Sequence, residues 1–98
     1  RGLGDVYKRQ KKALRKIAKP LCENKIDYDD AIKIVAKTMK ISKKQVTIYP
    51  CELSNCIIVG VNTRRKRKKE GLTDVVEAAI DCEDRTFYVY VFTSKEKF

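Results

Sequence analysis

The sequence predicts an α+β fold in which two N-terminal helices pack on one face of a mainly antiparallel sheet of three to four strands. Apolar residues recur with a helical period before residue 40, whereas β-branched and aromatic residues dominate the runs after residue 45. Residues 49–59 also align with residues 80–90, and each copy carries a Cys-Glu pair before a strand-like run. Two copies are too few for a solenoid, so we interpret them as two hairpins of one sheet.

The first ten residues, RGLGDVYKRQ, stand apart from this pattern. They resemble the translation of a transposon-end adapter used in sequencing libraries, with Asp5 to Gln10 read in frame. The resemblance implies that residues 1–10 are an artefact and that the source is an assembled, metagenomic sequence; the alternative is a genuine basic leader. A bacterial or phage origin is a separate expectation. We therefore expect residues 11–98 to form a single small basic α+β domain, the C-terminal part of a longer chain.

Two helices are expected in the N-terminal half. The first covers Lys11 to Lys19, where the apolar residues fall on one face, and Pro20 is expected to kink or end it. The second begins after Asp27, a preferred N-cap residue, with Asp30 at the third helical position. Its predicted buried stripe consists of Ile32, Val35, Ala36 and Met39.

Residues 41–49 allow two interpretations. Ser42 and its neighbours resemble a helix-turn-helix pattern over residues 31–49, in which Lys43, Lys44, Gln45 and Thr47 would lie in a DNA major groove. The resemblance implies a winged-helix transcription regulator, although Lys40 replaces the usual turn glycine and Pro50 would shorten the recognition helix. The second interpretation makes Gln45 to Tyr49 a strand, because its last four residues are all good strand formers.

The C-terminal half is predicted to be β-rich. Cys56 to Val61 and Thr86 to Phe92 have the composition of strands, and polar turns are expected at residues 51–55 and 82–85. Leu72 to Ile80 fits either a short helix or a strand, and the hairpin interpretation favours the strand.

Positive charge is the strongest functional signal in the sequence. The net charge is +10, and residues 11–50 hold eleven cations against four acids, whereas residues 71–98 hold three against six. Clustered cations neutralise phosphates and release counterions, which requires charge density more than exact geometry. The densest cluster is a basic arm of six consecutive residues, and Lys43 and Lys44 are expected to extend its surface. The arm consists of Arg64, Arg65, Lys66, Arg67, Lys68 and Lys69.

An aromatic stripe is expected on the last strand. Tyr88, Tyr90 and Phe92 would share one face, while Phe87 and its alternate neighbours take the other. If the helices cover the Phe87 face, Tyr88 and Tyr90 could stack on nucleic-acid bases. Packing against a second subunit or another protein explains the same stripe. The chain would then be a protein-interaction module or mobile-element inhibitor.

Four cysteines, Cys22, Cys51, Cys56 and Cys82, occur without a Cys-x-x-Cys pair, and the chain has no histidine. We expect reduced, largely buried thiols, with zinc binding and disulfides as the alternatives. Without histidine, an ordinary acid–base or triad arrangement is excluded, and the acids at residues 81–84 suit a turn.

Together these features predict a non-catalytic nucleic-acid-binding module that binds DNA or RNA. A homodimer or a protein partner is a further expectation. No cofactor, metal or small-molecule substrate is expected. No apolar run is long enough to cross a bilayer, so we expect no membrane contact and a cytoplasmic location.

Overall fold

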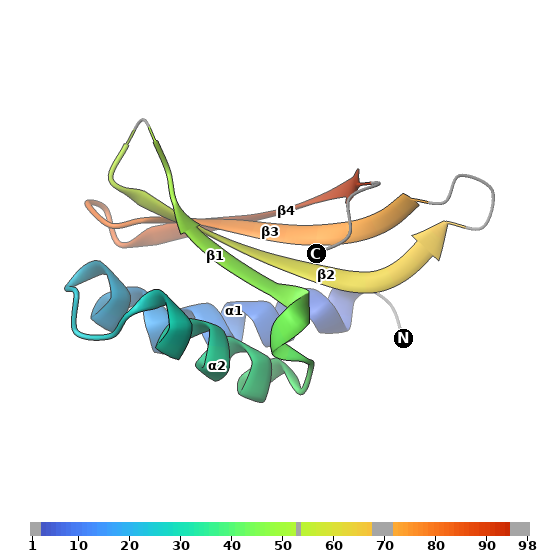
Figure 1. Ribbon diagram of the computed structural model, residues 1–98. Coiled ribbons are helices and arrows are strands. Elements are labelled where there is room, and N and C mark those ends of the chain that lie inside the picture. Colours follow the sequence, from blue (N-terminus) through green and yellow to red (C-terminus); the bar gives the residue numbers. More distant parts are fainter. Residues whose placement is uncertain (1–2, 53, 68–71, 95–98) are drawn as a thin grey trace.

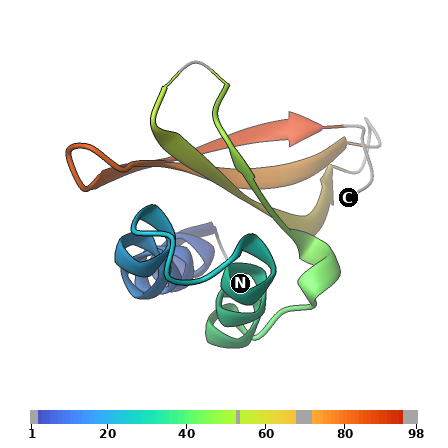
Figure 2. The same cartoon turned by 60° about the vertical axis from the view of Figure 1, so that its left-hand side comes forward.

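The computed structural model describes residues 3–52, 54–67 and 72–94, with the backbone alone described at residues 3, 65–67, 72 and 90–94. Two helices lie side by side on one face of a four-stranded sheet (Figures 1 and 2). The predicted α+β fold is therefore confirmed. The core fills the space between the two layers, and the other face of the sheet carries no helix.

Helix α1 spans Leu3–Cys22 and so begins well before the expected residue 11. Its fully buried apolar residues include Leu14 and Ile17, which confirms the predicted helical face. Pro20 lies in the last turn, and the helix ends two residues later. Gln10 is also fully buried, and its Nε2 donates to the carbonyl oxygens of Val59 and Val76 on the sheet, each at 3.3 Å.

Helix α2 spans Tyr28–Met39 and has the predicted N-cap. The Asp27 Oδ1 accepts a hydrogen bond from the Asp30 amide at 2.7 Å, which satisfies one of the unpaired donors of the first turn. At the other end Lys40 adopts the left-handed conformation with φ of 59°, and the Ile41 amide donates to the Ala36 carbonyl at 3.0 Å. This left-handed residue turns the chain back towards the sheet.

The strand interpretation of residues 45–49 is confirmed, and the recognition helix is wrong. Ser42 does act as an N-cap, but of the short 3-10 helix η1, Lys43–Gln45, after which β1 runs over Val46–Pro50. Val46 and Ile48 are buried with strand alternation, so the β-branched residues favour a strand under the helices. The Gln45 Nε2 donates to the Asn62 carbonyl at 3.0 Å and fixes η1 against the sheet.

The remaining strands are β2, Cys56–Arg67, β3, Leu72–Asp81, and β4, Thr86–Ser94. They pair antiparallel in the order β1-β2-β3-β4, which confirms the two hairpins, both turns and the strand over residues 72–80. Ile48, Val59, Ala78 and Val89 are register partners across the four strands. These four residues belong to or pack against the core cluster, so this face of the sheet meets the helices.

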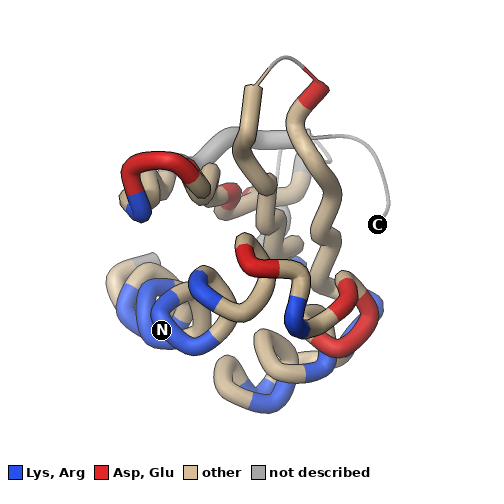
Figure 3. Tube along the Cα trace, turned by 90° about the vertical axis from the view of Figure 1, so that its left-hand side faces the viewer, with Lys and Arg blue, Asp and Glu red and all other residues tan. Residues whose placement is uncertain are grey.

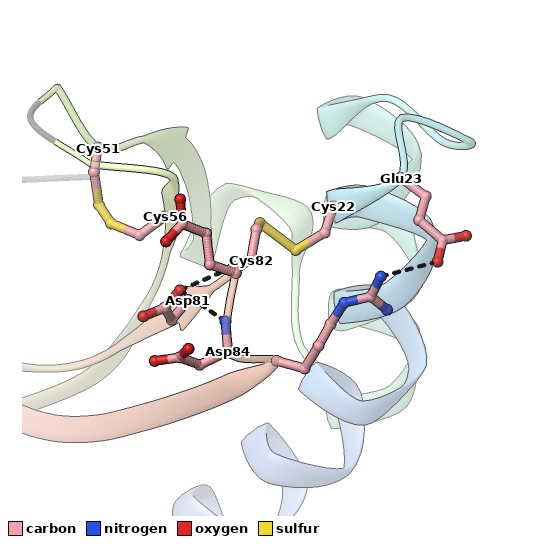
Figure 4. Close-up of a disulfide and its surroundings, with 9 residues drawn as sticks. Cys22, Glu23, Cys51, Cys56, Asp81, Cys82 and Asp84 are labelled. Carbon is pink, nitrogen blue, oxygen red and sulfur yellow. Dashed lines mark hydrogen bonds and ion pairs between the residues drawn. A yellow bond between two sulfur atoms is a disulfide. The ribbon is translucent and has the colours of Figure 1, made fainter.

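The expectation of reduced, buried cysteines is wrong. Cys22 is paired with Cys82 and Cys51 with Cys56, with Cα–Cα distances of 5.4 and 5.3 Å (Figure 4). Cys51 and Cys56 flank the β1–β2 turn, and the Cys51 amide donates to the Cys56 carbonyl. The other bridge forms because the β3–β4 turn packs over the end of α1, where Arg85 also contacts Glu23 at 3.3 Å.

Candidate nucleic-acid interface

The exposed side of the helix layer carries two matching rows of lysines, one on each helix. Within each row the residues are spaced i, i+4, i+7, so the members that lie within a helix share one of its faces. The Lys16 Nζ donates to the Thr38 hydroxyl at 3.4 Å, which shows that the outward faces of the helices adjoin. We call this surface the lysine face; all its members are exposed, and it consists of Lys12, Lys16 and Lys19 of α1, Lys33 and Lys37 of α2, and Lys40, the C-cap residue of α2.

Most lysines of the lysine face form no ion pair with a described residue. Lys33 pairs with Asp29 at 3.3 Å, but no ion pair within the described ranges involves the other five lysines. Like charges at i, i+4 destabilise a helix by about 0.2–0.5 kcal/mol per pair. Each row therefore lowers stability slightly, and binding a polyanion would offset this repulsion.

Lys43 and Lys44 lie beside the strand that leads into the basic arm. They are exposed members of η1, which is held to β2 through Gln45 and Asn62. Arg64 is exposed, has a φ of 60°, and its amide donates to the Asn62 Oδ1 at 2.8 Å. The side chains of residues 65–67 and all of residues 68 and 69 lie outside the described part of the chain.

Most of the described acidic residues gather at one end of the molecule, where the α1–α2 connection and the two hairpin turns meet (Figure 3). Glu23 contacts Lys25 at 3.1 Å and Arg85 at 3.3 Å. These cations, Lys25 most strongly, lower the pKa of Glu23. The other acids of the α1–α2 connection, the first turn of α2 and the two hairpin turns are Asp27, Asp29, Asp30, Glu52, Asp81, Glu83 and Asp84.

Tyr88, the described member of the predicted tyrosine stripe, lies on the other side of the molecule. Tyr88 is 65% exposed on the face of the sheet without helices, while Phe87 and Val89 pack against the core. Tyr49, 43% exposed, lies in the same cross-strand row, and the sequence alone did not single it out. The side chains of Tyr90 and Phe92 lie outside the described set. The structure thus does not bring Tyr88 and the lysine face together.

Tyr49 also interacts with a carboxylate on this face. Its hydroxyl donates to the Glu77 Oε2 at 3.2 Å. Desolvation raises the pKa of Tyr49, and the negative charge and hydrogen bond of Glu77 raise it further. An acid at this position disfavours a phosphate directly over the centre of the sheet.

The acidic residues of the β3–β4 turn have a structural role, because one of their carboxylates stabilises the turn. The Asp81 Oδ1 accepts hydrogen bonds from the amides of Glu83, at 2.9 Å, and Asp84, at 3.2 Å (Figure 4). Among the described residues, no group of three or more cysteines, acids or histidines is placed to hold a metal ion. Neither described helix is long and apolar enough to cross a membrane.

Comparisons with protein-family models, with curated proteins and with solved structures found no match to this chain. The candidate interface is therefore defined by the charges and positions of this chain's own residues. Sequence reasoning selected the basic arm but did not select the lysine face. The identical i, i+4, i+7 spacing of Lys12, Lys16 and Lys19 and of Lys33, Lys37 and Lys40 is the signal that predicts it.

Proposed function

We propose that this chain is a non-catalytic nucleic-acid-binding module whose lysine face contacts phosphates. The observation that carries the proposal is the pair of adjoining lysine rows, which concentrate exposed cations on one side of the molecule. The first and last lysines of the α1 row are seven residue steps apart, or about 10 Å along the helix. This length suits several consecutive phosphates of a DNA or RNA backbone.

The distribution of acids supports the same orientation. The acidic end would repel a polyanion, whereas Lys43 and Lys44 of η1 and Arg64 of β2 continue the positive charge from the end of α2 towards the basic arm. A nucleic acid on the lysine face could therefore extend to the arm without crossing the acidic end. Tyr88, on the far side, would stack on bases only if a flexible single strand wrapped around the β4 edge.

The test is fluorescence anisotropy of the chain with labelled duplex DNA, single-stranded DNA and RNA over a range of salt concentrations. The double variant Lys12→Gln/Lys37→Gln removes one cation from each row. If both lysines contact phosphates, the slope of log affinity against log salt for duplex DNA becomes shallower by about 1.8.

The matched control is Lys25→Gln/Arg85→Gln, which removes the same charge at the acidic end, where both cations contact Glu23. We expect the control to keep the slope of the unmodified chain. Equal losses in both variants would mean that only net charge matters, and no binding at low salt would overturn the proposed function.

The cytoplasmic location expected from the sequence stays a prediction, and the two disulfides favour an oxidising compartment instead, because cytosolic thiols are kept reduced. Alkylation of the chain under denaturing conditions, directly after cell lysis, decides between them. Four modified cysteines would indicate a reducing compartment, and none would indicate an oxidising one.

A further inference from the structure

Strand β4 is an edge of the sheet, and its described residues lack the charges, proline and bulge that often protect an edge. Its sequence, TFYVYVFTS, contains no charged residue, proline or glycine, although 37% of the chain is charged. It pairs with β3 in unbroken register from Thr86 to Ser94, so no bulge turns it away. The opposite edge, β1, has only five residues and ends at Pro50. Long, uncharged edge strands are templates for further strand pairing.

Helix α1 leaves this edge accessible. A surface groove of about 420 Å³ lies between α1 and β4 and is lined by Tyr7, Lys11, Phe87, Tyr88 and Val89. Phe87 and Val89 are half-buried towards the helices, whereas Tyr88 is mostly exposed on the other face. A strand added to β4 would therefore meet apolar side chains on both faces of the sheet.

We propose that β4 pairs antiparallel with β4 of a second copy of this chain, around a twofold axis at Tyr90. The strand is chemically symmetric about this residue: Val89 would oppose Val91 of the second copy, and Tyr88 would oppose Phe92. The two residues of each pair lie on the same face of their sheets, as the twofold axis requires. The result is one eight-stranded sheet with both helix layers on the same side.

The second copy fits this edge better than a peptide of another protein. The strand offers no charge with which to select a peptide, but its symmetry makes it complementary to itself. Lys11 and the net charge of +10 oppose the approach of two copies. Added salt should therefore strengthen the dimer, whereas it weakens phosphate binding. The inference does not depend on the proposed function, and the opposite salt responses distinguish them.

The first test is the mass of nucleic-acid-free protein by sedimentation equilibrium at low and high salt. We expect a dimer that high salt strengthens, and loss of that dimer in Tyr88→Lys, which places a charge on the β4 edge. The matched control, Tyr49→Lys, makes the same change in the same row at the opposite edge and should stay dimeric. A monomer at every concentration and salt, or equal behaviour of the two variants, would overturn the proposal.

The register is tested by crosslinking under mild oxidation. The twofold places residue 90 opposite itself, within about 4.5–5.5 Å between Cα atoms, a separation that a disulfide can span. The two copies of residue 88 would be offset by about 13 Å along the strands. Tyr90→Cys should therefore form a covalent dimer, and Tyr88→Cys should not. Crosslinking of Tyr88→Cys alone would overturn the register.

Discussion

Gln10 is a buried polar residue whose hydrogen bonding is incomplete. Its Nε2 has two carbonyl partners, but its Oε1 has none among the described residues. An unpaired buried acceptor costs about 1–3 kcal/mol, and the two donor bonds are long. If residues 1–10 derive from an adapter, as their sequence predicts, this glutamine was not selected for its buried position.

We therefore predict that Gln10→Leu raises the free energy of unfolding by about 1 kcal/mol, measured by urea denaturation. Gln10→Ala is the control, because it removes the same polar group but leaves a cavity, and it should lower stability. A fall in stability for Gln10→Leu would show that the bonds to Val59 and Val76 outweigh the unpaired oxygen.

The raised pKa of Tyr49 predicts how the stability of the fold changes at alkaline pH. Its pKa is raised in the folded chain by desolvation and by Glu77, so folding favours the neutral phenol. This contribution to stability is complete below the unfolded pKa of about 10 and is lost as pH rises through the higher folded pKa. Glu77→Gln should lower the pKa of Tyr49 part of the way, because desolvation remains.

The measurement is absorbance of phenolate during alkaline titration, with Tyr49→Phe used to assign the signal of this residue. Glu77→Asp is the informative control, since it keeps the charge but shortens the side chain that accepts the hydrogen bond. An unchanged Tyr49 pKa in Glu77→Gln would mean that the carboxylate does not act on the phenol.

Among the secondary-structure elements, those with a clear local period were predictable, while long-range pairings were not. The cap at Asp27, the two turns and the strands over residues 56–61 and 86–92 follow from residue type and alternation. The Cys22–Cys82 bridge depends on how the β3–β4 turn packs on α1, which no local pattern reports. The Cys51–Cys56 bridge did have a signal, because the predicted turn at residues 51–55 places these two residues across a hairpin.

In the candidate site, too, the residue types were predictable from the sequence, but their arrangement in space was not. Which residues are cationic was evident, but only the fold reveals that the lysine face and Tyr88 lie on opposite sides of the sheet. The burial of Gln10 was also unforeseen, because the helix was expected to begin after it.

The two disulfides should differ in how much they stabilise the fold. Cys22 and Cys82 are 60 residues apart, whereas Cys51 and Cys56 are five apart. In the chain-entropy model the longer loop contributes about 4 kcal/mol and the shorter about 2 kcal/mol. We predict that Cys22→Ser/Cys82→Ser lowers the free energy of unfolding by about 2 kcal/mol more than Cys51→Ser/Cys56→Ser.

Urea denaturation of both double variants under non-reducing conditions measures this difference. Each variant keeps the other bridge and therefore serves as the control for it. Equal losses, or a larger loss from removing the Cys51–Cys56 bridge, would contradict the role of the longer bridge in joining α1 to the β3–β4 turn.

Over the whole molecule, the acidic end and the lysine face adjoin, because Lys33 pairs with Asp29 and Lys19 acts on Glu23. Lys12 lies about 10 Å further along α1 than Lys19, which exceeds the Debye length of about 8 Å at physiological ionic strength. The acidic end therefore offsets the charge of the nearest lysines and does not cancel the field of the more distant ones. A polyanion is expected to approach the helix layer with the acidic end directed away from it.

The decisive measurement is the mapping of amide chemical shifts in ¹H–¹⁵N spectra while a short DNA or RNA is added at low salt. We predict that the largest changes fall on residues 12–19 and 33–40 and on Lys43 and Lys44, and that added salt reverses them. Changes concentrated around Tyr49 and Tyr88, or no changes at low salt, would contradict phosphate binding by the lysine face.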